Sequence, residues 1–173
     1  MALNIYSASV PVFTTMLTNA KVWLDKGAAY ADQKKFDVSV LLQARLAPDM
    51  FHFTRQIQAA TDQAKGGTAR LQGIPVPSFE DNEKTIADLH ARLDKTIAFV
   101  KTADAEKMLA LQENEVVFQA GTNERRYKNG EEYLRTYVMP NFFFHITTAY
   151  GILRHNGIDV GKADYLRGGR PAS

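Results

Sequence analysis

The sequence predicts an all-α protein built as one four-helix bundle, with a long connection between the second and third helices and a small β-hairpin before the last helix. Two observations support this fold class. Four separate segments carry apolar residues at alternating spacings of three and four, which is the period of an amphipathic helix. The intervening segments contain turn residues, and two of them alternate in the manner of short strands. Helices that each bury one apolar stripe pack around a shared core.

The first helix is expected between about Leu3 and Lys26. Its apolar stripe consists of Leu3, Tyr6, Val10, Phe13, Leu17, Ala20 and Leu24. Pro11 interrupts this stripe, and a proline cannot donate a backbone hydrogen bond inside a helix. The helix therefore either starts near Ser9 or is kinked at Pro11.

The second helix is expected to start at Pro48, because proline suits a first helical turn and Asp49 stabilises the positive end of the helix dipole. Its stripe consists of Met50, Phe53, Ile57, Ala60 and Ala64. The pair Gly66-Gly67 is expected to end it. Before it, the leucines of VSVLLQARL can form a separate short helical turn. After it, LQGIPVPSFED is expected to be a loop because it contains glycine and proline.

The third helix is expected to open near Asp81. Its stripe consists of Ile86, Leu89, Leu93, Ile97 and Val100, and the pattern breaks at residues 102–105. The segments EVVF (115–118) and ERRY (124–127) flank the turn sequence GTN, which predicts a β-hairpin. Asn129-Gly130 then forms a turn in which either residue can cap the next helix.

The fourth helix is expected from about Glu131 to His155, with Asn156-Gly157 as its stop. Pro140 falls inside it and cannot donate to the carbonyl of Thr136, so a kink or local bulge is expected there. The tail IDVGKADYLRGGRPAS is expected to be mostly irregular, and flexible from about residue 166.

Composition limits the classes of function. The 173 residues suit a single domain that spans the whole chain. The net charge is +2 and the densest basic sequences are pairs such as Lys34-Lys35 and Arg125-Arg126, which argues against nucleic-acid binding. The chain has no cysteine, which excludes disulfides and thiolate metal sites, and no apolar run approaches a membrane span. A cytoplasmic protein with no nucleic-acid or membrane partner is therefore expected.

Two polar residues stand in the middle of the stripe predicted for the last helix. That stripe consists of Leu134, Val138, Asn141, His145, Thr148 and Ile152. Asn141 and His145 are about one turn apart, so their side chains project the same way. A buried, unpaired amide or imidazole costs roughly 1–3 kcal/mol, so the pair must find partners. It is either a structural hydrogen-bond pair or one wall of a polar pocket between helices.

The second helix offers two partners for this pair, Gln56 and His52. On a helical wheel of about 100° per residue, Gln56 lies at the edge of the apolar stripe and His52 is turned further outward. Gln56 is therefore the better candidate for the same cavity. His90 is expected at the surface, and His155 is expected to interact with the negative end of the helix dipole.

Several segments resemble a known family. HITTAYGILRHNG resembles the last helix of the DinB/YfiT-like superfamily, in which H-x-x-x-H precedes a turn rich in leucine and arginine and then a glycine. Aligning Gly157 with that glycine places Asn141 and His145 on the two histidine positions. An uncharacterised, domain-of-unknown-function branch of the superfamily is resembled more closely, by LAPDMFHFTRQ, ARLQGIP, PNFFFHITTAYGILRHNG and IDVGKADYL. The resemblance spans nearly the full chain and implies a DinB-like four-helix bundle.

The resemblance also implies where a site would lie. Enzymes of the superfamily hold a divalent metal with three histidines, one from the second helix and two from the last, and act as thiol-dependent transferases, isomerases or hydrolases. This chain keeps His145, has Asn141 at the other position of the last helix, and offers Gln56 or His52 at the position on the second. An amide oxygen is a poor ligand for zinc or nickel. The expected site is a polar pocket of Gln56, Asn141 and His145 without a tightly bound metal or other cofactor, with Thr148 or Tyr150 nearby.

Three functions remain open. The first is a bundle that binds a small molecule, or acts chiefly as an interaction module, without metal catalysis. The alternative is a thiol transferase or hydrolase that uses zinc or nickel held by His145 and His52. The third is a purely structural polar cluster.

Two further expectations concern the surface. The three phenylalanines 142–144 exceed what one seam needs and Phe143 is expected to point away from Asn141 and His145, which predicts a homodimer. Lys162 and Asp164 match the G-K-x-D pattern of the branch. They are expected to form a surface ion pair that ties the tail down or, alternatively, to contact a substrate.

Overall fold

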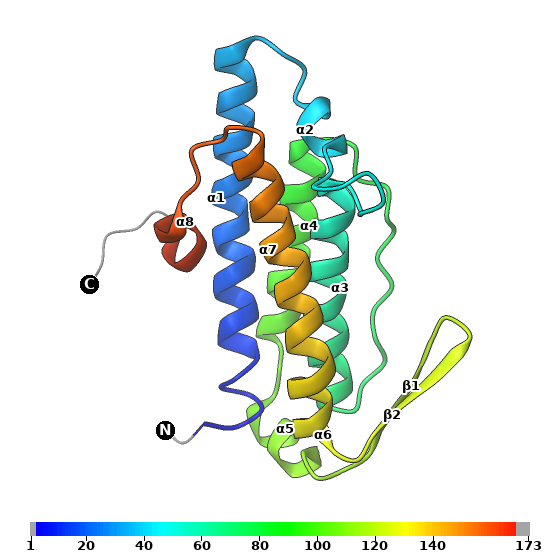
Figure 1. Ribbon diagram of the computed structural model, residues 1–173. Helices are drawn as coiled ribbons and strands as arrows, with labels where there is room; N and C mark the ends of the chain where they lie inside the picture. Colours follow the sequence, from blue (N-terminus) through cyan, green and yellow to red (C-terminus); the bar gives the residue numbers. More distant parts are fainter. Residues whose placement is uncertain (1–2, 169–173) are drawn as a thin grey trace.

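Four long helices form the body of the protein in the computed structural model, which describes residues 3–168 (Figure 1). They are α1 (Val10–Lys34), α3 (Phe53–Leu71), α4 (Ile86–Lys101) and α7 (Met139–His155). α4 and α7 each pack against both α1 and α3, so the predicted all-α bundle is confirmed. None of the helices within residues 3–168 is both long enough and apolar enough to cross a bilayer.

Shorter elements connect the long helices. They are α2 (Ser39–Gln43), α5 (Ala105–Leu111), α6 (Gly130–Tyr133), the π-helical segment η1 (Leu134–Val138), α8 (Lys162–Arg167), and the strands β1 (Val116–Ala120) and β2 (Asn123–Tyr127). The strands pair antiparallel, from Val116 opposite Tyr127 to Ala120 opposite Asn123, so the predicted hairpin is confirmed. In Figure 1 it extends sideways from the end of the bundle where α5 and α6 lie. The helices α5 and α8 were not predicted, because they are too short to show a helical period.

The first helix starts where Pro11 allows it. Ser9 precedes the first helical residue, and Pro11 lies in the first turn, where a missing N–H breaks no hydrogen bond. The predicted start near Ser9 is therefore confirmed. The predicted end near Lys26 is wrong, because the helix continues to Lys34 and keeps Ala31 buried in the core.

The helix α3 begins later than predicted. It starts at Phe53 and not at Pro48, which lies in exposed, non-helical chain. His52 is the N-cap, and its Nδ1 accepts a hydrogen bond from the backbone N–H of Arg55 at 3.4 Å. The short α2 before it confirms the separate helical turn expected from the leucines.

The glycine pair was predicted to end α3, but it lies inside the helix. The helix runs through Gly66 and Gly67 to Leu71. Both glycines are buried, and a Cβ atom on Gly67 would lie only 2.6 Å from Cγ1 of Val138 in η1. The pair therefore permits close packing around α3, which local sequence cannot distinguish from a helix stop.

The third long helix starts at Ile86 and not near Asp81. The hydroxyl of Thr85 accepts from the N–H of Asp88 at 3.1 Å, and the Asp88 carboxylate accepts from the N–H of Thr85 at 2.9 Å. This reciprocal capping box sets the first turn. Residues 72–85 form the long connection that was predicted, without helix or strand.

The last helical run extends from α6 through η1 to α7. Asn129 caps it, because its side-chain oxygen accepts from the N–H of Glu132 at 2.9 Å. The bulge expected at Pro140 is confirmed, since η1 ends just before this proline. A π-helical turn accommodates a residue that cannot donate to the preceding turn.

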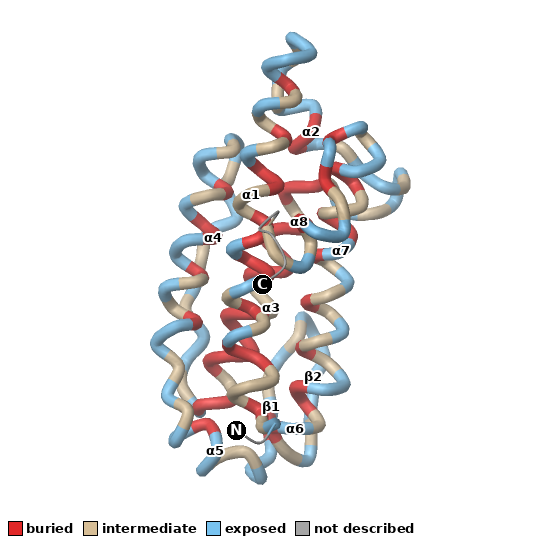
Figure 2. Tube along the Cα trace, turned by 90° about the vertical axis from the view of Figure 1, so that its left-hand side faces the viewer, coloured by how far each residue is buried: buried red, intermediate tan, exposed pale blue. Residues whose placement is uncertain are grey.

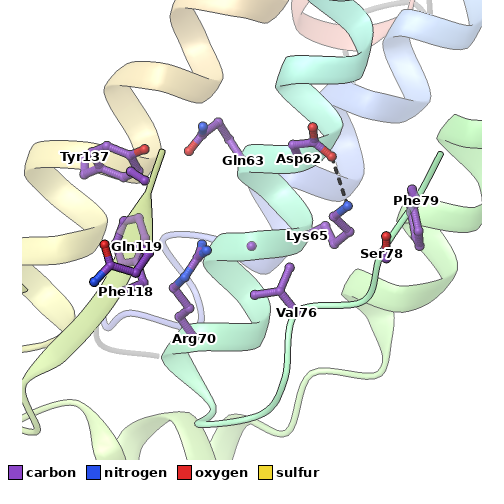
Figure 3. A pocket seen from close by; sticks show the side chains of 12 residues that line it. Asp62, Gln63, Lys65, Arg70, Val76, Ser78, Phe79, Phe118, Gln119 and Tyr137 are labelled. Atoms are coloured by element: carbon purple, nitrogen blue, oxygen red, sulfur yellow. Dashed lines mark ion pairs between the residues drawn. The ribbon is translucent and has the colours of Figure 1, made fainter. Parts of the chain in front are cut away.

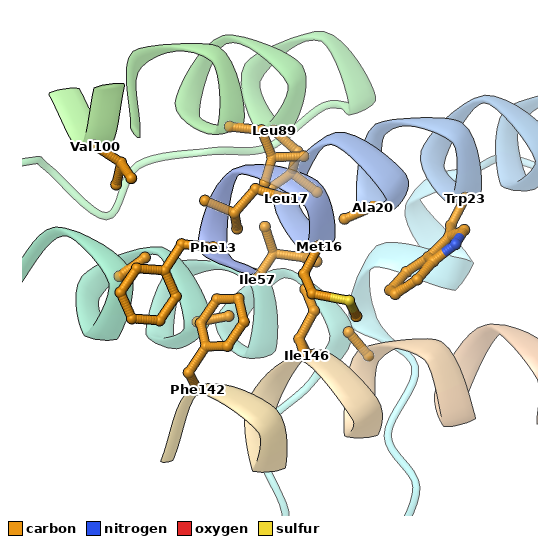
Figure 4. Packing of buried hydrophobic residues seen from close by; sticks show 14 of the residues in the cluster. Phe13, Met16, Leu17, Ala20, Trp23, Ile57, Leu89, Val100, Phe142 and Ile146 are labelled. Carbon is orange, nitrogen blue, oxygen red and sulfur yellow. The ribbon is translucent and has the colours of Figure 1, made fainter. Parts of the chain in front are cut away.

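The core fills the centre of the bundle (Figure 4). Buried positions follow the inner faces of the helices in Figure 2. The rings of Phe13 and Phe142 meet edge to face with centroids 4.9 Å apart, and Trp23 is fully buried. The centre of α7 therefore consists of Phe142, Ile146 and Ala149, and Asn141 and His145 lie at its edge rather than in the predicted interior seam.

The tail is tied to α1 by Asp164. Its carboxylate pairs with Lys26 at 2.7 Å, and its backbone carbonyl accepts from the indole N–H of Trp23 at 3.1 Å. The predicted anchoring role is thus carried by Asp164, but its partner is Lys26 and not Lys162, which is exposed. The predicted irregular tail contains α8, and residues 169–173 of the expected flexible end lie outside the described residues.

Candidate functional site

The structure brings together two of the predicted site residues, Gln56 on α3 and His145 on α7. Nδ1 of His145 lies 2.8 Å from Oε1 of Gln56, and Nε2 of Gln56 donates to the carbonyl of Phe51 at 3.1 Å. Because the amide oxygen can only accept, Nδ1 carries the imidazole proton. In the neutral ring, Nε2 of His145 is then an unprotonated acceptor, and no residue of the described chain donates to it.

Two phenylalanines flank this pair. The ring of Phe51 stacks on His145 with centroids 6.3 Å apart, and Phe144 meets it edge-on at 5.2 Å. Phe51 is 49% exposed and Phe144 is 56% exposed. Burial, and secondly the charge of Arg55, lower the pKa of His145 below its usual value, so the neutral ring is favoured. The pair is thus a half-buried polar spot in an aromatic surface.

The other predicted members of the pocket bond elsewhere. Asn141 donates to the carbonyl of Tyr137 at 2.6 Å, and the hydroxyl of Thr148 donates to the carbonyl of Phe144 at 2.6 Å. The hydroxyl of Tyr150 donates to the carbonyl of Val160 at 3.2 Å. Each of these three side chains therefore donates to a backbone carbonyl, and none of them is hydrogen-bonded to His145.

The three remaining histidines also have other partners or are exposed. His52 uses Nδ1 as the cap acceptor of α3, which leaves the proton of its neutral ring on Nε2. Burial, and secondly Arg45, lower the pKa of His52. His90 pairs with Asp25 at 2.8 Å, and His155 is exposed at the end of α7. Within residues 3–168, no group of three or more His, Cys, Asp or Glu side chains could hold a metal ion.

The phenylalanines predicted to form a dimer interface differ in burial. Phe142 is fully buried, Phe143 is partly buried against the core, and only Phe144 is mostly exposed. The homodimer stays a prediction, and Phe144 is the residue of the three that a partner could contact.

A cavity of ≈ 300 Å³ lies further along α3 and was not predicted (Figure 3). It opens between α3, the connection 72–85, β1 and η1, and its lining includes Gln63, Lys65, Arg70, Phe79, Phe118 and Tyr137. The seven-residue spacing of Gln56, Gln63 and Arg70 is a sequence signal for a shared helix face. That signal is lost when Gly66-Gly67 is interpreted as the end of the helix.

A buried charge network supports one side of this cavity. Arg92 on α4 has a side chain that is only 2% exposed, and it pairs with Asp62 at 3.0 Å, Asp81 at 3.0 Å and Glu83 at 2.9 Å. Lys65 also pairs with Asp62, at 2.9 Å. The network holds the connection 72–85 against α3 and α4.

Phe79 is the aromatic anchor of that connection. The ammonium groups of Lys65 and Lys95 lie 4.3 Å and 4.1 Å from the centroid of its ring. Such cation–π contacts stabilise a ring among charged neighbours. The wall of the cavity formed by this connection is therefore fixed by both charge and aromatic contacts.

Comparisons with known proteins agree with this fold. A family model described as domain of unknown function (DUF1993) matches residues 5–166. A crystal structure of a DinB family member protein from Shewanella denitrificans, at 1.83 Å resolution, is 38% identical in sequence and superposes with a TM-score of 0.83. The match covers 95% of this chain and 96% of that one. No curated protein matches the chain.

Proposed function

This chain belongs to the DUF1993 family, a DinB-like branch with no assigned function, and from that premise we propose that it binds a small organic molecule at the Gln56–His145 pair without a tightly bound metal. The observation that carries the proposal is the 2.8 Å hydrogen bond between Nδ1 of His145 and Oε1 of Gln56. It orients the imidazole and leaves Nε2 as a hydrogen-bond acceptor between two partly exposed phenylalanines. Small-molecule sites combine aromatic side chains with a few polar groups placed for hydrogen bonding, and the Gln56–His145 pair offers both kinds of group.

The chemistry of the donors argues against tight metal binding. Zinc and nickel require several imidazole, thiolate or carboxylate ligands that converge on one point. The resemblance to DinB-like proteins aligns Asn141 with a second histidine, and in the structure its amide nitrogen donates to the carbonyl of Tyr137. The ligand that fits is instead a flat, largely apolar molecule with one N–H or O–H donor, such as a phenol or an indole.

The test is performed on the full chain with ¹⁵N-labelled histidine. Phenol and indole are titrated while the Nε2 resonance of His145 is followed by NMR, and we expect a saturable shift. The variant His145→Ala should abolish binding, and His155→Ala serves as the matched control because this histidine is exposed at the end of the same helix. A titration in which neither compound moves the His145 resonance contradicts the proposal.

A second function, a thiol transferase or hydrolase that uses zinc or nickel, is favoured by one feature of the same pair. In metal-binding histidines, the N–H of the ring nitrogen that does not bind the metal commonly donates a hydrogen bond to an oxygen, as Nδ1 of His145 does to Gln56. His52 would be the second imidazole. To bind a metal through Nε2 it would have to move its ring proton to Nδ1, which could then no longer accept the capping hydrogen bond from Arg55. Elemental analysis after purification without added metal separates the two functions. One zinc or nickel per chain, lost in both His145→Ala and His52→Ala, would establish the metal site and refute the proposal above.

A further inference from the structure

Arg70, in the last turn of α3, is positioned by a hydrogen bond and a cation–π contact, and its side chain passes close to Gly66. Its Nη1 donates to the hydroxyl of Tyr133 at 3.1 Å, and its guanidinium carbon lies 4.0 Å from the centroid of the Phe118 ring. The side chain also folds back over Gly66, where a Cβ atom would lie 2.6 Å from Nη1. A glycine at this position therefore makes room for the guanidinium.

The charge of Arg70 is not balanced by an ion pair within residues 3–168, where no carboxylate lies within 4.0 Å of it. The neighbouring cations differ in this respect, because Lys65 and Arg92 both pair with Asp62. Burial raises the pKa of Tyr133 to about 12, so its hydroxyl stays neutral and supplies no counter-charge. A partly buried guanidinium without a carboxylate is an unusual arrangement, because desolvating a cation costs free energy unless an anion offsets it.

The guanidinium faces the cavity of ≈ 300 Å³ (Figure 3). The nitrogens of Arg70 point into the space below Tyr137 and Gln63 in that view, and Phe118 lies on the same side. Arginine has five N–H donors in a planar fork, of which Tyr133 takes one. The remaining donors match the two oxygens of a carboxylate, and the rings of Phe118 and Tyr137 offer flat apolar surface beside them.

We propose that this cavity binds a small organic carboxylate, with its carboxylate on Arg70 and its flat apolar body against Phe118 and Tyr137. The site is separate from the Gln56–His145 pair, because neither of those residues lines the cavity. It is therefore independent of the function proposed above. Lys65 also lines the cavity, but its charge is balanced by Asp62, which lines the cavity too, so the proposed carboxylate depends on Arg70 for its counter-charge.

The test uses calorimetric titration of the full chain with benzoate, with benzamide as an uncharged probe of the same shape. We expect benzoate to bind, benzamide to bind at least about tenfold more weakly, and Arg70→Gln to weaken benzoate by a similar factor, as for charged hydrogen bonds. Arg154→Gln is the matched control, because it removes the same charge from an exposed position at the end of α7. Equal affinity for benzamide and benzoate contradicts the proposal.

A second variant tests the position of the guanidinium rather than its charge. Gly66→Ala keeps Arg70 and favours the helix, but its new Cβ displaces Nη1. It should retain the helical circular dichroism signal and weaken benzoate binding less than Arg70→Gln does, because only the flexible end of Arg70 has to shift. The proposal is overturned if Gly66→Ala weakens benzoate binding more than Arg70→Gln does, if the parent shows no binding up to roughly 10 mM benzoate, or if inorganic phosphate binds through Arg70 and benzoate does not.

Discussion

The contact between Gly67 and Val138 sets how closely α3 approaches η1, and it leads to a quantitative prediction. In Gly67→Ala, the new Cβ would lie 2.6 Å from Cγ1 and 3.5 Å from Cγ2 of Val138. Ordinary carbon contacts are about 3.5–4.0 Å, so the first distance is a clash. Val138 is fully buried and β-branched, which restricts its rotamer in a helix, so relief requires the two elements to move apart.

Two effects of known size oppose each other in this variant. Replacing an interior helical glycine by alanine stabilises a helix by up to about 1 kcal/mol. Overpacking a well-packed core destabilises it by about 1–3 kcal/mol. We therefore expect Gly67→Ala to leave the free energy of unfolding unchanged or to lower it by up to about 2 kcal/mol.

The Val138→Ala background separates the two effects. It removes both methyl groups, and the nearest remaining atom of residue 138 is then Cβ at 3.6 Å, an ordinary contact. In this background Gly67→Ala should stabilise the protein by about 1 kcal/mol, because only the helix propensity remains. The coupling energy of the double-mutant cycle should thus equal the overpacking term of about 1–3 kcal/mol.

Urea denaturation followed by far-ultraviolet circular dichroism measures all four variants. The slope with urea should stay the same among them, so that shifts of the midpoint report stability. If Gly67→Ala stabilises the protein equally in both backgrounds, with a coupling below about 0.5 kcal/mol, the close approach of α3 and η1 is refuted.

Three more predictions concern charged and titrating groups. Arg92→Met should lower the free energy of unfolding by about 2–4 kcal/mol in urea melts, because it leaves three carboxylates without their guanidinium partner, and two of these carboxylates are partly exposed. A decrease below about 1 kcal/mol contradicts a stabilising role of this network. Burial opposes ionisation of Asp164, but Lys26 and a backbone N–H outweigh it, so its pKa lies below the usual value. Its stabilising effect is present above about pH 3.9 and is lost as the pH falls through the lower, folded pKa, so acid should release α8 and change the fluorescence of Trp23. Asp164→Asn should show the altered fluorescence already at neutral pH, and an unchanged acid transition in this variant would argue against the anchor. NMR titration of His145 should yield a pKa below about 6.5, so its stabilising effect is present above that pH and is lost as the pH falls through the folded pKa; His145→Gln should remove this dependence, and a pKa above 6.5 would show that the ring is not desolvated.

Local sequence patterns predicted the elements that repeat one short-range rule. Apolar spacing indicated the four long helices, and the alternation around GTN indicated the hairpin. The wheel of α3 placed Gln56 closer than His52 to the position that faces His145, and the two side chains are hydrogen-bonded in the structure. These features follow from period and composition within one segment, which the sequence displays directly.

Local patterns failed where a distant residue decides the outcome. Gly66-Gly67 is a helix stop by local propensity, but the pair lies inside α3, where the missing side chain of Gly67 lets Val138 of η1 approach closely. Asp164 was assigned to Lys162, its neighbour in sequence, whereas the fold brings Lys26 to it from α1. In both cases the deciding contact joins different elements.

The sequence by itself therefore determined that this chain forms a DinB-like bundle with one imidazole facing an amide. Only the tertiary structure decided that Asn141 donates a hydrogen bond to a backbone carbonyl and that Arg70 lines a cavity without a carboxylate partner within the described chain. The physical reason is that periodicity specifies which face of a helix is apolar. The partner of each polar side chain depends on which elements pack together and how closely their backbones approach.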